Sequence, residues 1–336
     1  MTAPEALVCL PVDGIGEVAA GDDLAALVAG AVTLLDGDIV VVTSKVVSKS
    51  EGRVRAGKRE EALTEETDRT VAWRGRTAIV RTHHGLVMAA AGIDASNTVT
   101  DTVVLLPRDP DASARRLREG LAVRTGRNVA VLVTDTAGRA WRNGQTDIAI
   151  GAAGLDVLDD HVGRTDPHGN ELAVTARAVA DELAAAADLV KRKLDRRPVA
   201  VVRGLGELVL RPQVHGPGAV ALVRDEATDM FGLGAREAVL CALLHEDARG
   251  FGAPCSPLEL VAALSAAAGS AAAVRLEGQD GDQDGDQDGV VSVRPGGSER
   301  EQGAVHARVE AAAFALGWRL APDGDGPPLR FHIPGP

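Results

Sequence analysis

The residues best suited to chemistry lie in one short segment after an apolar run. Asp135 and Thr136 come at the end of the apolar run 129–133. A carboxylate beside a hydroxyl is a ligand set that suits hard divalent cations. The next eleven residues add further polar side chains: Arg139, Trp141, Arg142, Asn143, Gln145 and Asp147. From residue type alone, we expect Arg139, Arg142 and Asn143 to contact phosphate or carboxylate groups, since paired guanidinium groups suit both anions. The alternative is an ordinary polar loop after a buried strand.

Two further polar clusters lie upstream, and they have the same design. The apolar run 39–42 is followed by Ser44 and Lys49, whose hydroxyl and ammonium groups suit a phosphate site. Asp94 and Asn97 lie in the segment 92–97, after a run of small residues, and we expect Asp94 to face Asp135 across a cleft. Each cluster alone is equally compatible with an ordinary turn. Three strand-end clusters in one chain favour a functional site.

Common nucleotide and hydrolase motifs are missing from the sequence. There is no Gly-x-x-x-x-Gly-Lys-Ser/Thr loop, and Gly14-Ile-Gly16 does not continue into a dinucleotide fingerprint. No Gly-x-Ser-x-Gly elbow is present either. A nucleotide site in this chain would therefore have to be built from strand-end loops.

Five segments carry a resemblance to a known family. They are 37–53, 86–97, 131–147, 166–172 and 201–206. Through them the chain from Cys9 to Gly234 resembles the coenzyme F420-0:L-glutamate ligases, most closely an actinobacterial form lacking the nitroreductase-like FMN domain. The resemblance implies an α+β fold of an uncommon, F420 gamma-glutamyl ligase-like architecture and an intertwined homodimer.

The resemblance also implies an activity and its site residues. The reaction would be GTP-dependent ligation of L-glutamate to coenzyme F420-0 through an acyl phosphate, with possible later γ-glutamyl additions. It would need Mg²⁺ or Mn²⁺, and K⁺. The family's metal ligands fall on Asp94, Asp135 and Thr136. Its GTP contacts fall on Ile15, Gly16, Glu17, Val18, Ser44, Lys49 and Asn97. At Gly16 this chain departs from relatives that often have proline before the glutamate, and no residue is assigned as a catalytic base.

Two other functions stay open at this stage. The first is a nucleotide- or phosphate-binding module without ligase activity. GTP hydrolysis that depends on both the deazaflavin and glutamate would separate it from a ligase. The second is a flavin oxidoreductase, because longer relatives carry an FMN domain after the ligase domain. The chain beyond Gly234 is too short for that domain and lacks its basic flavin-phosphate motif.

Composition and charge restrict the partners. The 336-residue chain has a net charge of −12, and half of it comes from the eight acidic and two basic residues between 277 and 301. There is no basic stripe with interleaved aromatics, which argues against a nucleic-acid partner. The three cysteines fit neither a metal spacing nor a disulfide framework. Without a signal peptide or a membrane-length apolar run, we expect a cytoplasmic protein with reduced thiols and no membrane partner.

Hydrophobic periodicity predicts alternating strands and helices, hence an α/β or α+β class. The predicted strands are 6–12, 39–42, 78–80, 103–106, 129–133 and 198–202, and the predicted helices are 22–35, 112–123 and 171–196. We place a ligase domain at 1–240 and a small α/β module of unknown role at 241–336. In the module we expect helices at 257–268 and 305–316 and strands near 274, 290–293 and 329–333. The acidic repeat 277–289 is interpreted as a solvated loop rather than a calcium loop, because Val291 stands where a bidentate acid is needed.

Overall fold

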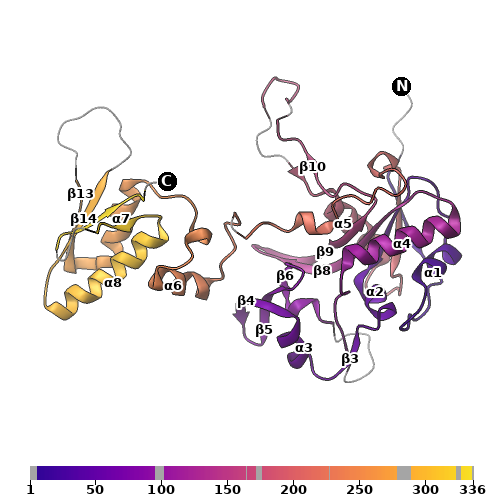
Figure 1. The fold of residues 1–336 in the computed structure, drawn as a ribbon, viewed down its shortest axis with the longest axis horizontal. Coiled ribbons are helices and arrows are strands. Elements are labelled where there is room, and N and C mark those ends of the chain that lie inside the picture. Colours follow the sequence, from indigo (N-terminus) through magenta and orange to yellow (C-terminus); the bar gives the residue numbers. More distant parts are fainter. Residues whose placement is uncertain are drawn as a thin grey trace. The chain divides into compact units, whose positions relative to one another are not determined.

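The computed structural model describes residues 6–94, 102–163, 165–171, 176–226, 228–277, 289–322 and 327–334. The chain forms two compact units, Met1–Val223 and Arg224–Pro336. Both units combine helices with sheets, and the main sheet of the first unit is mixed, which confirms the α+β class (Figure 1). The division lies before residue 240 because helix α6 (Ala235–Leu244) packs against α8 (Glu299–Ala315) of the second unit.

A five-stranded sheet organises the first unit. Its order is β1-β12-β2-β8-β9, with β2 and β8 parallel and the other pairs antiparallel. The strands are β1 (Val8–Val12), β12 (Val199–Arg203), β2 (Ile39–Thr43), β8 (Ala130–Arg139) and β9 (Arg142–Ala153). The predicted strands in this sheet are all confirmed, whereas β9 was not predicted, because its polar first half hides the alternation of a strand.

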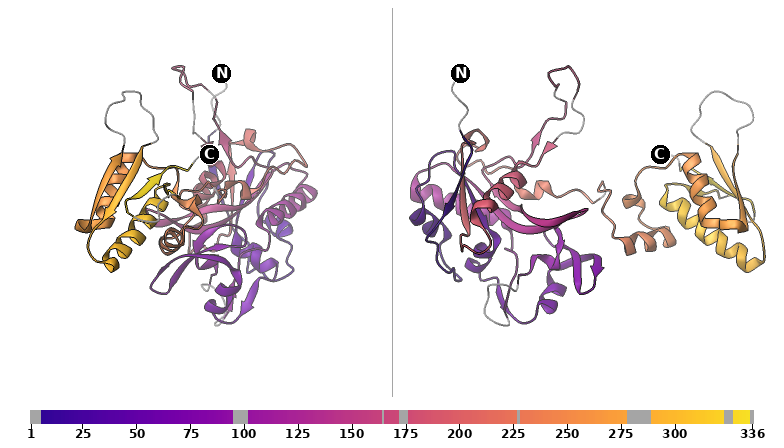
Figure 2. Two further views of the ribbon diagram at one scale, coloured as in Figure 1. Left: turned by 60° about the vertical axis from the view of Figure 1, so that its left-hand side comes forward. Right: turned by 180° about the vertical axis from the view of Figure 1, so that it is seen from behind.

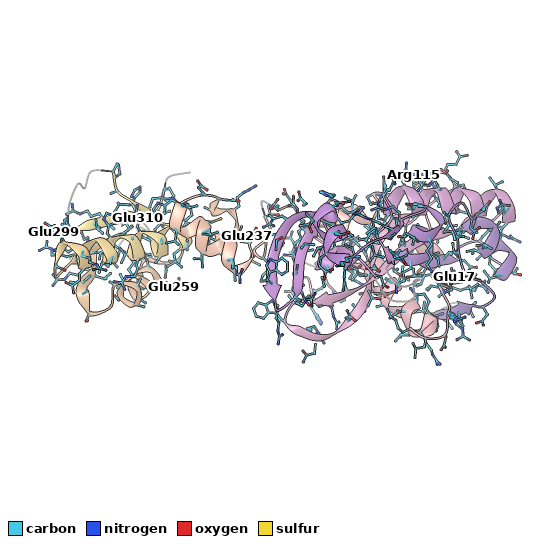
Figure 3. The ribbon with its side chains drawn as sticks, turned by 90° about the horizontal axis from the view of Figure 1, so that it is seen from below. Glu17, Arg115, Glu237, Glu259, Glu299 and Glu310 are labelled. Atoms are coloured by element: carbon cyan, nitrogen blue, oxygen red, sulfur yellow. The ribbon has the colours of Figure 1, made fainter. Side chains whose placement is uncertain are left out.

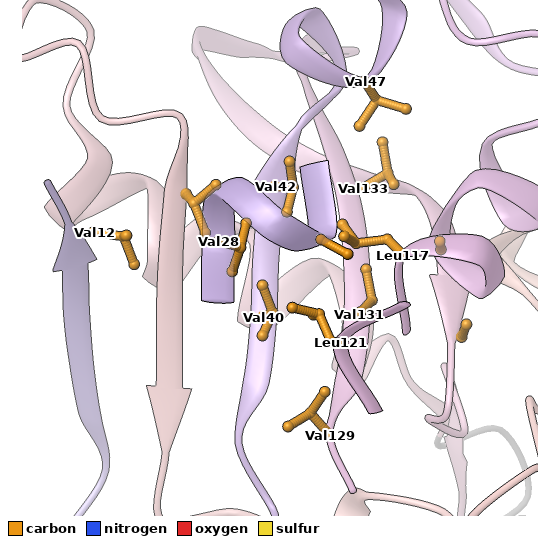
Figure 4. Close-up of a cluster of buried hydrophobic side chains, with 14 of the residues drawn as sticks. Val12, Val28, Val40, Val42, Val47, Leu117, Leu121, Val129, Val131 and Val133 are labelled. Atoms are coloured by element: carbon orange, nitrogen blue, oxygen red, sulfur yellow. The ribbon is translucent and has the colours of Figure 1, made fainter. Parts of the chain in front are cut away.

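Helices cover both faces of this sheet, because the strands are apolar on both sides. Val40 and Val42 of β2 pack on the face covered by α1 (Leu24–Ala31), α2 (Ser44–Ser50) and α4 (Pro110–Thr125), as Figure 4 shows. Ile39 and Val41 face the other way, towards α5 (Val179–Lys191). Both faces of β8 follow the same alternation, which decides where its polar end residues point.

Two helix predictions had the right place and the wrong length. The helix expected over 22–35 spans only Leu24–Ala31, with Asp23 as its N-cap and Val32 in an extended conformation. The helix expected over 171–196 spans only Val179–Lys191: strand β11 at Ala176–Arg177 precedes it, and Arg192 after it has a positive φ of 54°. Leu194 is 88% exposed and so lies outside the apolar face predicted for it. The helix expected over 112–123 is α4.

Smaller elements surround the main sheet. A three-stranded antiparallel sheet contains β4 (Thr67–Arg74), β5 (Thr77–Thr82) and β6 (Val87–Ala89), and a two-stranded ladder joins β3 (Val54–Ala56) to β7 (Thr102–Val104). The strands predicted at 78–80 and 103–106 fall on β5 and β7. The other short elements are α3 (Arg59–Glu66), η1 (Ala90–Gly92), β10 (Asp159–Asp160), β11 (Ala176–Arg177), η2 (Gly206–Leu208) and η3 (Ala219–Leu222).

The β8–β9 ribbon is longer than the strands beside it and extends past them (Figures 1 and 2). Its register is Thr134 opposite Ala149, Asp135 opposite Ile148 and Thr136 opposite Asp147. Ile150 is an extra residue on β9, since Val133 pairs with Gly151 and Thr134 with Ala149.

The second unit contains a four-stranded antiparallel sheet of order β13-β14-β16-β15. Its strands are β13 (Ala272–Glu277), β14 (Val290–Pro295), β16 (Leu329–His332) and β15 (Arg319–Leu320), with α7 (Pro257–Ala268), η4 (Ala248–Phe251) and η5 (Gly269–Ala271). The α7 capping box of Ser256 and Glu259 is confirmed. The predicted helix 305–316 begins earlier, at Glu299, because Ser298 and Glu301 form a second capping box.

Three expectations from the sequence concern thiols, membrane and the acidic repeat. Cys9, Cys241 and Cys255 are free. Within the described ranges, every helix is too short or too polar to cross a bilayer. Residues 278–288 of the acidic repeat lie outside the described residues.

Candidate functional site

The chemistry-bearing residues meet at one edge of the main sheet. Val12, Val199, Val42 and Val133 lie level across four neighbouring strands. Just beyond this row come the loop after β1, the start of α2, the polar end of β8 and the segment that leads into β12. The antiparallel course of β12 brings the end of α5 to the edge where the other three strands finish.

A pocket of about 690 Å³ lies at this edge. Its lining comes from four parts of the chain. The first part is the loop Gly14–Val18, and the second part contributes Thr43, Lys45, Val46 and Lys49. The other two are Asp135, Thr136 and Asp147 of the β8–β9 ribbon, and Asp188 with Lys191, Arg192, Lys193, Leu194, Arg196, Arg197 and Pro198.

The pocket wall is cationic in a protein that is acidic overall. Seven lysine or arginine side chains line it against four acidic ones, while the whole chain carries a net charge of −12. A concave surface with an excess of one charge raises the local concentration of oppositely charged ligands. The wall therefore favours an anionic ligand with several charges.

Asp135 is the most perturbed acid of the pocket. Its Oδ1 accepts a hydrogen bond of 2.8 Å from Ser44 Oγ. Burial, and secondarily the charge of Asp147, raise the pKa of Asp135 to about 6, although Ser44 and Lys45 act in the opposite direction. Because the nearby positive charge does not fully compensate this buried carboxylate, a bound cation would stabilise its ionised form.

Lys45 connects Asp135 electrostatically to Asp94. Its ammonium forms an ion pair with Asp94, and its charge also lowers the pKa of Asp135. Asp94 is held through backbone hydrogen bonds to Val104, and its side chain does not line the pocket. Asp94 and Asp135 thus both interact electrostatically with the Lys45 ammonium group, and their position across a cleft stays a prediction. Whether they share a metal stays a prediction.

Only some of the residues expected to contact GTP line the pocket. Ile15, Gly16, Glu17, Val18 and Lys49 all line the pocket. Lys49 pairs with Glu17, which is 83% exposed and labelled in Figure 3. Ser44 is buried, and its hydroxyl is directed to Asp135 rather than to the pocket wall. Asn97 lies outside the described residues.

Thr136, the expected hydroxyl ligand, belongs to a buried network on the α5 side of the sheet. Its Oγ1 donates to Asp147 Oδ1 at 2.8 Å, and Thr134 Oγ1 donates to Asp147 Oδ2 at 2.9 Å. Lys191 Nζ lies 2.7 Å from Asp147 Oδ2. Asp135 points to the opposite face, as strand alternation requires.

The three contacts expected from residue type alone lie elsewhere. Arg139, Arg142 and Asn143 are exposed at the tip of the β8–β9 ribbon, and none of them lines the pocket. Arg139 reaches the Asn143 carbonyl at 3.4 Å. Their contact with phosphate or carboxylate stays a prediction.

The sequence analysis missed the cationic segment 191–197. Its lysines and arginines, Lys191, Arg192, Lys193, Arg196 and Arg197, all line the pocket, although the segment was assigned to a helix. Five cations in seven residues before a buried strand were a readable signal. Their part in the site depends on β12 lying between β1 and β2.

The donor set suits a hard cation that is shared with a bound phosphate. Within the described ranges there is no group of three or more His, Cys, Asp or Glu side chains that could hold a metal ion. Mg²⁺ is usually bound by one or two carboxylates together with substrate phosphates and water. Asp135 and Thr136 line this cationic pocket from opposite faces of β8, and with Asp94 near Lys45 they offer the oxygen ligands that this mode of binding uses. The cationic pocket at this strand edge has the charge that suits phosphate-bearing anions.

Comparison with known proteins gives the family. The family model of F420-0:Gamma-glutamyl ligase matches residues 14–59 and 56–204. The coenzyme F420:L-glutamate ligase of Archaeoglobus fulgidus is 41% identical over 243 residues, covering 66% of this chain and 94% of that protein. The protein of the same name from Halobacterium salinarum is 44% identical over 218 residues, covering 57% and 85%. The chain belongs to the F420-0:gamma-glutamyl ligase family, and the family model covers the residues that line the pocket.

Proposed function

We propose that this protein is a GTP-dependent ligase that joins L-glutamate to coenzyme F420-0 in coenzyme F420 biosynthesis. Family membership supports the ligase role. The observation that carries the finer proposal is the cationic pocket, in which Asp135 and Thr136 adjoin Lys45, Lys49 and Lys191. GTP and a phosphate-bearing coenzyme are both polyanions, and this wall has the charge to bind them.

The proposed chemistry has two steps. A carboxylate is a poor acylating agent, because its oxyanion is a poor leaving group. In the first step a carboxylate oxygen of F420-0 attacks the γ-phosphorus of GTP, which forms an acyl phosphate and releases GDP. In the second step the glutamate amine attacks the acyl carbon, inorganic phosphate leaves and the amine loses a proton. Both steps need positioning and neutralisation of phosphate charge.

The chain supplies groups for both needs. Lys49 and the cations of 192–197 would hold and orient phosphate oxygens, and the Gly14–Val18 loop would contact the nucleotide. Asp135 and Thr136, with Asp94, would hold Mg²⁺ or Mn²⁺, which neutralises charge on the transferred phosphoryl group. We further propose K⁺ as an accessory cation, a homodimer as the assembly and the cytoplasm as the location.

The test is mass spectrometry of the product. The intact protein is incubated with GTP, MgCl₂, L-glutamate and glutamate-free F420-0. We expect F420 with one added glutamate and GDP in equal amounts. GTP hydrolysis at a rate that depends on neither F420-0 nor glutamate, without a ligated product, would instead indicate a nucleotide-binding module.

A further inference from the structure

Asp147 lies at the centre of a buried hydrogen-bond network in the pocket wall. It accepts from Thr136 Oγ1 at 2.8 Å, from Thr134 Oγ1 at 2.9 Å and from Lys191 Nζ at 2.7 Å. Lys191 also donates to Thr134 Oγ1 at 2.9 Å. The side chains of Lys191 and Asp147 are only 5% and 4% exposed. A charged pair buried this deeply needs its full set of partners.

The direction of these hydrogen bonds decides what Thr136 can do. An ionised carboxylate only accepts hydrogen bonds, so the single hydroxyl proton of Thr136 is given to Asp147. The hydroxyl proton is thus engaged with Asp147, and the lone pairs of Thr136 Oγ1 remain available. A hydroxyl coordinates a cation through those lone pairs. Thr136 is therefore held in the state that a metal ligand needs.

The sheet register fixes this arrangement. Thr136 and Asp147 are direct cross-strand partners on β8 and β9. Thr134 is two residues earlier and therefore on the same face, where Lys191 ends α5. Side chains directly opposite one another in a sheet interact closely. The network thus comes from three elements whose relative positions the core determines.

We infer that Asp147 is a positioning residue for the proposed cation site: it orients the Thr136 hydroxyl, while Lys191 compensates its charge. This inference rests on the proposed function, because that function supplies the cation. The Lys191 contact also engages Asp147 itself, so this acid orients the ligand rather than serving as one. Sequence and family comparison assign no role to either residue.

A direct Mn²⁺ titration without GTP tests the inference. Electron paramagnetic resonance measures the concentration of the free ion. Asp147→Asn should weaken Mn²⁺ binding roughly 10- to 100-fold, as loss of a partner that orients a metal ligand does. Asp188→Asn is the matched control, because Asp188 also lines the pocket and the charge change is the same. It should change the affinity no more than about threefold. Thr136→Ser, which keeps the hydroxyl, should bind almost like the unaltered protein.

A double-mutant cycle shows whether Asp147 acts through Thr136. In a Thr136→Val background, Asp147→Asn should cause little further loss of Mn²⁺ affinity, since the hydroxyl that it orients is already gone. Additive losses would overturn the inference.

A charge-balanced variant covers the case in which Asp147→Asn fails to fold, because that change leaves Lys191 buried without its counter-ion. The double variant Asp147→Asn with Lys191→Met removes both buried charges. Its Mn²⁺ affinity should still be lower than that of the unaltered protein. Unaltered affinity in that variant would overturn the inference while leaving the metal site in place. If the unaltered protein itself bound no Mn²⁺, the proposed metal site would fall together with the inference.

Discussion

At the residue scale, Asp135 is under two opposed demands. Burial raises its pKa from 3.8 to about 6, so the ionised form is disfavoured in the metal-free protein. A cation ligand must nevertheless be ionised. Ser44 and Lys45 stabilise the ionised form in part, and a bound divalent cation would supply the rest. This residue should therefore reduce stability when the metal is absent.

The first prediction concerns Asp135→Asn. Since the folded-state pKa is raised, the folded carboxyl holds its proton more tightly than the unfolded one. Its stabilising contribution is complete below pH 3.8 and is lost as pH rises through about 6. At pH 7.5 with chelator, Asp135→Asn should therefore raise the free energy of unfolding by about 1–2 kcal/mol. Mn²⁺-dependent stabilisation and turnover should disappear.

Thermal unfolding with EDTA and with MnCl₂, at pH 4 and pH 7.5, measures both effects. The gain in stability should be absent at pH 4, where Asp135 is protonated. A lower Tm of the variant in EDTA, or a Tm shift by Mn²⁺ equal to that of the unaltered protein, would remove Asp135 from the site.

Lys49 gives the second prediction at this scale. It lines the pocket and pairs with the exposed Glu17, so a phosphate can replace that partner. Lys49→Ala should weaken GTP binding by about 1.5–3 kcal/mol, the usual contribution of a hydrogen bond to a charged group. KM for GTP measures the effect, and Lys58→Ala is the control because Lys58 is exposed and does not line the pocket. Equal KM values in the two variants would show that Lys49 is only a solvated surface residue.

At the scale of elements, the site depends on how closely β9 packs against α4. Gly151 on β9 leaves no space for a side chain, because a Cβ there would lie 2.3 Å from the Pro110 carbonyl oxygen. Pro110 is the first residue of α4, whose N-cap Asp109 accepts a hydrogen bond from Ala112. This contact holds the strand that carries Asp147 against the helix layer.

The third prediction compares two glycines on the same ribbon. Gly151→Ala should lower the free energy of unfolding by about 1–3 kcal/mol, since the backbone of α4 must move. Gly138→Ala should be close to neutral, because a Cβ at Gly138 has no heavy atom within 4 Å. Urea unfolding of both variants measures the difference. Equal stabilities would mean that β9 and α4 are not packed as described.

At the scale of the whole molecule, the chain has two units with separate cores. The core of the second unit includes Leu260, Leu264, Phe331 and Trp318, and the Trp318 indole donates to the Cys255 carbonyl at 3.0 Å. Every described residue of the proposed site belongs to the first unit. The second unit is therefore not expected to take part in the chemistry.

The fourth prediction is that residues 1–234 suffice for the first ligation. This truncation ends before α6 and retains the whole pocket. It should form the one-glutamate product at a rate within about threefold of the full chain, a difference of less than 1 kcal/mol in activation free energy. Mass spectrometry of the product is the measurement, and circular dichroism confirms folding. A folded but inactive truncation would assign the second unit a part in catalysis.

A flavin titration of the full chain completes this prediction. We expect no stoichiometric FMN binding, because the acidic repeat of the second unit repels phosphate. Tight FMN binding by the intact protein would assign the second unit a flavin function.

The sequence by itself determined that strands alternate with helices, in an α/β or α+β class. It also determined the predicted strands of the main sheet and the strand-end position of Asp135 and Thr136. These features follow from local apolar patterns, and a strand delivers polar residues at its end whatever lies beside it. The resemblance in segments such as 131–147 identified the family, and the family model matches residues 14–59 and 56–204. Local pattern was weaker at helix ends: the apolar spacing of 171–196 continues past Lys191, where Arg192 turns the backbone.

Only the tertiary structure decided which charges meet. Asp147 and Lys191 are 44 positions apart in the chain, and Ser44 and Asp135 are 91 apart. Their pairing depends on the order β12-β2-β8-β9, on the extra residue Ile150 and on α5 covering one face. A buried charge is stabilised by partners brought from distant parts of the chain, and local residue preferences carry no information about them. For the same reason, the cationic segment 191–197 had the composition typical of a helix end in the sequence. In the fold its lysines and arginines line the pocket.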